Sequence, residues 1–299
     1  MKKTYLDKVD TLLHILPLVT EEECFAIHGG TAINLFVNNL TRLSVDIDIT
    51  YLPLEDRNSS IQHINEALLR IAAQVKSVLK GVHIIPRLDI CKLTCEYRGR
   101  QIKLEVNQTK RGVIGGEVLT MPLCEKAQEL FVTYAEVRIV PLTLLYGGKI
   151  AAALSRQHPR DLFDIQHMSL PLSDAKEGFL FNVLSSDRPI HETFAPNLID
   201  QQQAMQSQFE GMSDIPFTYA DFEQTRAQLI DNVNALLTEN EKKFLISFEL
   251  GTPDWTLFDH PEFADYPSVR WKLLNLNKLK QDNPIKLQEE ADKLKAILL

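Results

Sequence analysis

The seven residues from 45 to 51, VDIDITY, alternate apolar and polar side chains with a period of two. That period predicts a β-strand whose two faces differ. The valine and the first two isoleucines would face a hydrophobic core, so Asp46 and Asp48 must share the opposite face. Two carboxylates held side by side repel one another, and one pKa rises unless a cation lies between them. The strand therefore presents either an exposed acidic face or a site for Mg²⁺, which prefers oxygen ligands.

A pair of glycines, Gly29 and Gly30, lies between a predicted strand at 24–28 and a predicted helix at 31–38. A glycine turn before a helix lets the backbone approach a phosphate closely, where free N–H groups are available. Thr31 adds a hydroxyl at the first turn, either as a helix cap or as a phosphate contact. Any strand-to-helix turn can use glycine, so this segment is also compatible with a purely structural role.

A third acidic residue, Glu105, lies in a predicted strand at 101–108. By the same alternation Glu105 shares its face with Lys103, while the apolar residues face the other way. Glu105 would join the two aspartates if the two strands are neighbours. The alternative is an exposed strand residue paired with a nearby lysine.

A charged helix follows at 141–156, where Lys149 and Arg156 lie seven residues apart and share a face. Asp161 and Asp164 are three apart in the next predicted helix and also share a face. The cations could bind a triphosphate, and Asp161 could orient Lys149 or contact the base or ribose. A solvated charged surface is the alternative for each of these residues.

The order of predicted elements favours a mixed α/β (α+β) domain followed by a mainly helical one. We place the domains at residues 1–170 and 171–299. The predicted strands and helices of the first part, beyond those given above, are 4–18, 60–79 and 82–97. A predicted helix at 159–168 lies just before the boundary. The predicted helices of the second part are 174–183, 197–209, 218–237, 239–249, 268–280 and 284–298.

Composition narrows the class of protein further. The chain has 32 Lys and Arg against 40 Asp and Glu, a net charge of −8, which argues against a protein that coats duplex DNA. Lys103, Lys110 and Arg111 could form a local basic rim for RNA phosphates, and scattered surface charge is the alternative. No secretory signal or membrane-spanning stretch is evident, and the four cysteines are expected to be reduced thiols in a cytoplasmic protein. Trp255 and Trp271 are expected in the core of the helical domain.

Four ordered blocks carry a resemblance to a known family. They are Gly29-Gly30-Thr31-Ala32, Arg42-x-Ser44-x-Asp46-x-Asp48, Lys103-x-Glu105, and Lys149-x-x-Ala152-x-x-x-Arg156-x-x-x-Arg160-Asp161-x-x-Asp164. Together they resemble the AbiEii/AbiGii abortive-infection toxins of bacterial type IV toxin–antitoxin systems. These toxins are nucleotidyltransferases of the DNA polymerase β-like superfamily, and the similarity extends over about residues 20–170.

The resemblance implies a polymerase β-like core, with a mixed sheet and flanking helices, that moves an NMP from an NTP to an acceptor hydroxyl. It implies Mg²⁺ or Mn²⁺ bound by Asp46, Asp48 and Glu105. Lys149 and Asp161 would complete the catalytic set. The residues expected to bind nucleotide are Gly29, Gly30, Thr31, Arg42, Ser44, Lys149 and Arg156.

The acceptor implied by the resemblance is tRNA or another RNA, and a cognate antitoxin is the expected protein partner. Two alternatives remain open at the level of sequence. The first is an antibiotic-type nucleotidyltransferase with a small-molecule acceptor. The second is a non-catalytic relative that binds nucleotide or protein. The NTP used and the oligomeric state are not indicated by the sequence.

Overall fold

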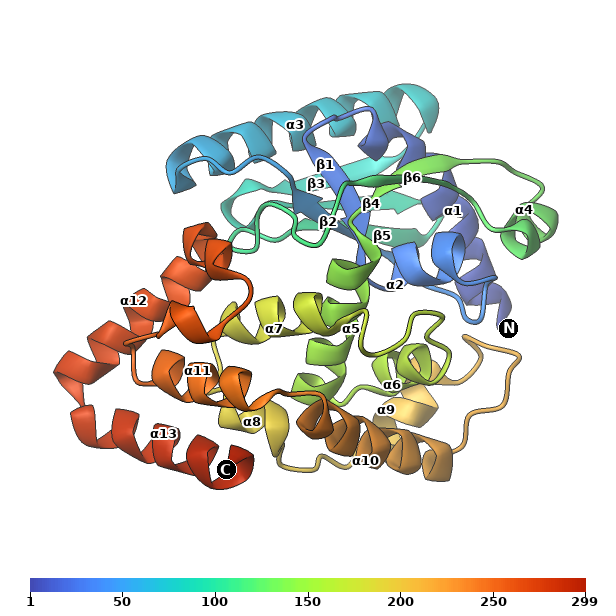
Figure 1. Cartoon of the computed structure of the whole chain (residues 1–299). Coiled ribbons are helices and arrows are strands. Elements are labelled where there is room, and N and C mark those ends of the chain that lie inside the picture. Colours follow the sequence, from blue (N-terminus) through green and yellow to red (C-terminus); the bar gives the residue numbers. More distant parts are fainter.

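A computed structural model describes the whole chain, residues 1–299, and places a seven-stranded mixed sheet in its N-terminal half (Figure 1). The strands are β1 (Phe25–His28), β2 (Asp46–Tyr51), β3 (His83–Arg87), β4 (Lys92–Tyr97), β5 (Arg100–Val106), β6 (Leu119–Pro122) and β7 (Glu136–Ile139). Their order in the sheet is β3-β4-β5-β2-β1-β7-β6. β2 is parallel to β5 and antiparallel to β1, so it lies in the middle of the sheet.

Two long helices, α1 (Lys3–Thr20) and α3 (Arg57–Val78), contact the strands and each other. They cover the sheet in the upper part of Figure 1. The predicted alternation in β2 is confirmed, because Ile47 and Ile49 are buried whereas Asp46 and Asp48 are partly exposed. The short helix α2 (Gly29–Ala32) contacts β2 and also reaches α5. The face of β2 that carries the aspartates is therefore open to other elements of the chain.

The second half is helical, as predicted. Its elements include α5 (Leu142–Arg156), α6 (Pro159–Gln166), α7 (Lys176–Leu184), α8 (His191–Phe194), α9 (Gln202–Ala204), α10 (Tyr219–Ala235), α11 (Glu239–Glu249), α12 (Pro267–Asp282) and α13 (Pro284–Leu298). They fill the lower part of Figure 1, from yellow-green to red. The predicted α/β core followed by a helical portion is confirmed.

Glycines allow α5 and α7 to pack backbone against backbone. A Cβ on Gly147 would lie 2.1 Å from the carbonyl carbon of Gly178, and a Cβ on Gly178 would lie 2.0 Å from the Thr143 oxygen. One continuous cluster of buried apolar side chains includes residues from both halves. The domain boundary near residue 170 stays a prediction, and α7 is the element after it that is most tightly joined to α5.

Several element boundaries differ from the predictions. The predicted strand at 82–97 is interrupted by a 3₁₀ turn at Leu88–Ile90, after which Cys91 adopts a positive φ of 50°. The helix predicted at 31–38 begins two residues earlier and continues as a π-helical turn over Ile33–Val37. The helix predicted at 197–209 is limited to residues 202–209. Helix α4 (Glu125–Phe131) and the four-residue strands β6 and β7 were not predicted, because such short segments show little periodicity.

All four cysteines are free thiols, as expected, although only two of them are fully buried. Of the helices in the structure, none combines the length and apolar character that crossing a membrane requires.

Candidate active site

The three predicted acidic residues lie on adjacent strands. Asp48 on β2 is aligned with Glu105 on parallel β5, and with His28 on antiparallel β1. Asp46 is two residues before Asp48 and therefore points to the same face of the sheet. The expectation that Glu105 would stand beside the aspartates if the strands were neighbours is confirmed. A cavity of about 350 Å³ opens against Asp48, His28 and Glu105.

The ionisation of Asp48 reflects this crowding. Burial, together with the nearby negative charges of Asp46 and Glu105, raises the pKa of Asp48 to about 6. The cations Lys149 and Arg156 act in the opposite direction without cancelling the rise. A carboxylate that is this costly to ionise gains from a bound cation.

Glu105 has a second interaction, with Lys92 on β4. The two residues are aligned in the β4–β5 ladder and their side chains form an ion pair, while the Glu105 side chain is 48% exposed. In this structure Glu105 therefore pairs with a neighbouring lysine, as the alternative prediction stated. Glu105 has both the position of a third acid and a cationic partner that it would exchange on binding a metal.

The glycine pair is required by close packing against the strand. Gly29 has a φ of +74°, and a Cβ there would lie 2.4 Å from Asp48 Oδ2. A Cβ on Gly30 would lie 2.8 Å from Arg42 Nη2. A larger residue at either glycine would therefore displace a side chain of the predicted site, Asp48 or Arg42. The backbone of this turn therefore reaches closer to Asp48 than any other residue type would allow.

Thr31 and Ser44 secure the start of β2. Thr31 is fully buried; its hydroxyl donates to the Asp46 carbonyl oxygen at 2.5 Å and lies 3.1 Å from the Ser44 hydroxyl. The Thr31 hydroxyl is thus used to hold the strand at Asp46.

A buried ionic network lies beneath the acidic face. Arg42 donates two hydrogen bonds to Asp164, from Nε at 2.7 Å and from Nη2 at 2.6 Å. Lys149 pairs with Asp164 at 2.9 Å and with Asp161 at 2.8 Å. Asn34 donates a further bond to Asp164 at 2.9 Å. The structure therefore brings together the predicted Lys149 and Asp161, and it occupies the guanidinium of Arg42.

Electrostatics keep this network ionised. Burial alone would raise the pKa values of Asp161 and Asp164, but the adjacent cations hold both well below their usual range. Burial would likewise lower the pKa of Lys149, yet its two carboxylate partners hold it above the ordinary value. Arg156 pairs with Asp161 at 2.5 Å while its side chain stays 61% exposed. Arg156 is the predicted cation most available to a ligand.

Two polar residues outside the predicted set of site residues also lie at the site. Asn34 accepts a bond from the Arg42 backbone N–H at 3.2 Å and donates to the Gly30 oxygen at 3.0 Å, so it links the glycine turn to the network. His28 lines the cavity next to Asp48, and burial with two nearby lysines lowers its pKa to about 4. In the sequence, only the position of His28 directly before the two glycines pointed to a place near the site.

Comparison with protein families identifies the chain. The family model described as "Nucleotidyl transferase AbiEii toxin, Type IV TA system" matches residues 10–275. The chain belongs to the AbiEii family of nucleotidyltransferase toxins. The expected resemblance is confirmed, and it extends well beyond the four motif blocks into the helical half. The protein is accordingly a nucleotidyltransferase toxin of a type IV toxin–antitoxin system.

A solved structure shares the AbiEii-family fold. MenT4, a nucleotidyltransferase toxin from Mycobacterium tuberculosis H37Rv, superimposes with a TM-score of 0.60 at 14% identity. The match covers 92% of this chain and 95% of MenT4, so both halves of the fold are shared. No curated protein matches the sequence.

The acidic face of this AbiEii-family toxin fits a divalent cation by its donor set. Asp46, Asp48 and Glu105 offer only oxygen ligands. Burial, with the charges of Asp46 and Glu105, raises the pKa of Asp48, and a cation would offset that cost of ionisation. As they stand, the ligand oxygens of the three carboxylates do not all lie within 4.8 Å of one another. Release of Glu105 from Lys92 would accompany metal binding.

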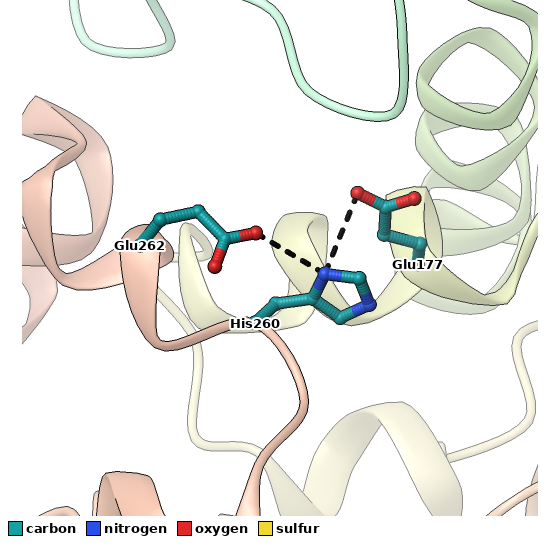
Figure 2. Close-up of side chains that lie close together, drawn as sticks. All are labelled: Glu177, His260 and Glu262. Carbon is teal, nitrogen blue, oxygen red and sulfur yellow. Dashed lines mark hydrogen bonds and ion pairs between the residues drawn. The ribbon is translucent and has the colours of Figure 1, made fainter.

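A tighter group of possible ligand atoms lies elsewhere, at the junction of α7 with the segment before α12. Glu177, His260 and Glu262 each place a ligand atom within 4.8 Å of the others (Figure 2). Both carboxylates approach the same imidazole nitrogen, Nδ1, at 3.7 Å and 3.2 Å. An N–H at Nδ1 can donate to these carboxylates, and none of the three residues belongs to the AbiEii-like motifs.

The two clusters make different predictions about metal dependence. His260→Ala should leave the Mg²⁺ concentration for half-maximal activity within about twofold of wild type, because it removes only a half-exposed ion pair and the stacking on Phe263. Asp48→Glu should raise that concentration at least about tenfold, because a displaced ligand weakens the site. Titration of activity with Mg²⁺ measures both. A tenfold shift caused by His260→Ala would move the metal site to the second cluster.

The raised pKa of Asp48 also predicts a pH-dependent stability. Since the folded state disfavours the ionised carboxylate, wild type loses stability as pH rises from about 4 through about 6. Asp48→Asn lacks this loss, so without metal it should be about 1–2 kcal/mol more stable than wild type near pH 8. The difference should vanish towards pH 4. Urea unfolding at several pH values checks this, and equal stabilities throughout would contradict the raised pKa of Asp48.

Proposed function

We propose that this toxin moves a nucleoside monophosphate from an NTP to an acceptor hydroxyl, with Mg²⁺ or Mn²⁺ held by Asp46, Asp48 and Glu105. The observation that carries the proposal is the alignment of Asp48 with Glu105 on parallel strands, on the face shared with Asp46. A bound metal would neutralise the triphosphate and polarise the phosphorus under attack.

The chain's own groups account for the rest of the reaction. An acceptor oxygen attacks the α-phosphorus, the bond between the α-phosphorus and its bridging oxygen breaks, and pyrophosphate leaves. Glu105 accepts the proton of the acceptor hydroxyl once it is released from Lys92, and Asp48 lies beside it. Catalysis then rests on positioning and charge neutralisation.

Binding of the triphosphate is proposed for the cations and the glycine turn. Arg156 presents an exposed guanidinium that Asp161 holds in place, and Lys149 is fixed by the same carboxylate. The backbone of Gly29 and Gly30 lies next to Asp48 and completes the phosphate contacts.

The remaining predicted nucleotide-binding residues act by positioning. Arg42 is held by Asp164, whereas Thr31 and Ser44 hold the start of β2. We propose that all three keep the acidic strand in place for the residues that contact the nucleotide directly.

The acceptor that we propose is RNA, with tRNA as the first choice, and the toxin would act in the cytoplasm to interrupt phage infection. Membership of a type IV toxin family supports this role and implies a cognate antitoxin. A small-molecule acceptor is the competing outcome.

The acceptor can be identified with NTPs labelled in the α-phosphate. Each of the four NTPs is incubated with the toxin and Mg²⁺, together with total RNA in one arm and an RNA-free metabolite extract in the other. Label in the RNA arm supports the proposal. Label confined to the metabolite arm would assign a small-molecule acceptor, and calorimetry showing no NTP binding with Mg²⁺ would indicate a non-catalytic protein.

A further inference from the structure

A second and larger cavity lies between the nucleotidyltransferase core and the last two helices. Its volume is about 680 Å³, and its walls include one face of α5, the end of α7 and parts of α12 and α13. Asn107, just after β5, lines both this cavity and the one at Asp48 and Glu105. The two cavities are therefore neighbours, and a chain lying in the larger one can end at the acidic face.

Small side chains on α5 leave this cavity deep. Gly148, Ala151, Ala152 and Ser155 form the wall. A Cβ on Gly148 would meet nothing closer than the Asn182 amide at 3.7 Å. The same helix carries Lys149 and Arg156 on an adjacent face, towards Asp161. α5 thus separates the proposed triphosphate contacts from the larger cavity.

The charge in the cavity is suited to an anionic ligand. Four cations line it, Lys110, Arg188, Lys272 and Lys286, against the three carboxylates Asp187, Glu249 and Glu290. Glu290 is already paired with His191 at 3.1 Å and Lys293 at 3.3 Å.

The lysines of the cavity differ in their hydrogen-bond partners, and so in how far their ammonium groups remain available to a ligand. The Lys110 ammonium donates to the neutral Asn182 amide at 2.8 Å, and Lys272 donates to the Arg188 carbonyl at 2.7 Å. No side-chain interaction occupies the Lys286 ammonium. No carboxylate forms an ion pair with Lys110 or Lys286, although burial lowers the pKa of Lys110 to about 8 against the opposing effect of the Asp187 charge.

An exposed tryptophan completes the cavity, and here the sequence-based expectation was wrong. Trp255 packs against Phe244 at 5.0 Å as predicted, but Trp271 on α12 is 52% exposed and lines the cavity. An indole face next to free cations is the combination that binds single-stranded nucleic acid, because bases stack on the ring while phosphates contact the lysines.

We propose that this cavity binds the single-stranded 3′ end of the acceptor RNA, with Trp271 stacked on a base and with Lys110 and Lys286 at phosphates. The inference rests on the proposed function in taking RNA as the acceptor. A terminal hydroxyl can then pass Asn107 to reach Asp48 and Glu105. Duplex RNA fits less well, since its bases are already stacked. A groove of this size also agrees with a chain whose overall charge of −8 disfavours extensive RNA contact.

The test measures RNA binding without catalysis. Fluorescence anisotropy is followed with a labelled single-stranded RNA of about 12 nucleotides, in the absence of NTP. Trp271→Ala should weaken binding at least about tenfold, whereas Trp271→Phe should retain most of it. Lys286→Ala should weaken binding and reduce the slope of log Kd against log salt by about 0.7. A duplex of the same sequence should bind more weakly than the single strand.

Two control positions lie on α12, the helix that carries Trp271. Leu274 and Lys278 are exposed but do not line the cavity, so alanine at either position should leave RNA affinity unchanged. Wild-type affinity in Trp271→Ala and Lys286→Ala would overturn the proposal. So would a wild-type protein that binds no single-stranded RNA, which would assign the cavity to another ligand such as a protein. NTP binding, measured separately by calorimetry, tests the proposed function independently and should be unchanged in Trp271→Ala.

Discussion

Asp164→Ala should lower the free energy of unfolding by about 3–5 kcal/mol, because it leaves two buried cations without one of their partners. Arg42 loses both of its bonds to a carboxylate, and Lys149 keeps only Asp161. Urea unfolding followed by circular dichroism measures the loss. A change below about 1 kcal/mol would show that the network contributes little to stability.

A double variant separates the charge from the packing. Arg42→Met with Asp164→Leu removes both charges and fills similar space, so it should recover much of the stability lost in Asp164→Ala. Asn34 and Lys149 keep other partners in this variant. If the double variant is as unstable as the single one, the penalty arises from lost bonds and not from an unpaired buried charge.

The same network predicts acid sensitivity. Because the fold lowers the pKa values of Asp161 and Asp164, their stabilising contribution is present above about pH 4 and is lost as pH falls further. Asp48 acts in the opposite direction over its own range. Within the candidate site, the buried pair Asp161 and Asp164 is thus stabilising when ionised, whereas Asp48 is destabilising when ionised.

Asp46→Ala should reduce nucleotidyl transfer by about three orders of magnitude or more, since a metal ligand contributes several kcal/mol to the transition state. The fold should be retained. Asp46 is partly exposed, and its backbone carbonyl, which binds Thr31, is unchanged by the substitution. Initial rates at saturating NTP and Mg²⁺ measure the effect.

A surface carboxylate provides the matched control for that rate. Glu129 on α4 is exposed and outside both cavities, so Glu129→Ala should transfer at the wild-type rate. Circular dichroism should show both variants folded. Transfer by Asp46→Ala within tenfold of wild type would remove Asp46 from the metal site.

The acidic strand could be predicted because its information is local. A period of two places Asp46 and Asp48 on one face whatever the rest of the chain does. The alignment with Glu105 required only that β2 and β5 be neighbours, which the sequence could state as a condition but not decide. The short strands β6 and β7 carried too few residues for any period to be detected.

The contacts that depend on long-range packing could not be predicted. Arg42 and Asp164 are 122 residues apart, so a buried bidentate pair could not be distinguished from two separate ligand-binding residues. The exposure of Trp271 could not be predicted either, since a tryptophan in an amphipathic helix usually packs in a core. Whether Trp271 is buried depends on the orientation of α12, and this orientation is set by packing throughout the helical half.

The measurement that most directly tests the account is the release of pyrophosphate and transfer of α-phosphate label to RNA by wild type and Asp46→Ala, each with and without Mg²⁺. We expect label in RNA and an equal amount of pyrophosphate from wild type with Mg²⁺, and almost none in the other three reactions. Equal labelling by Asp46→Ala, or labelling that does not require a divalent metal, would contradict the assignment of the acidic face of β2 as the catalytic metal site.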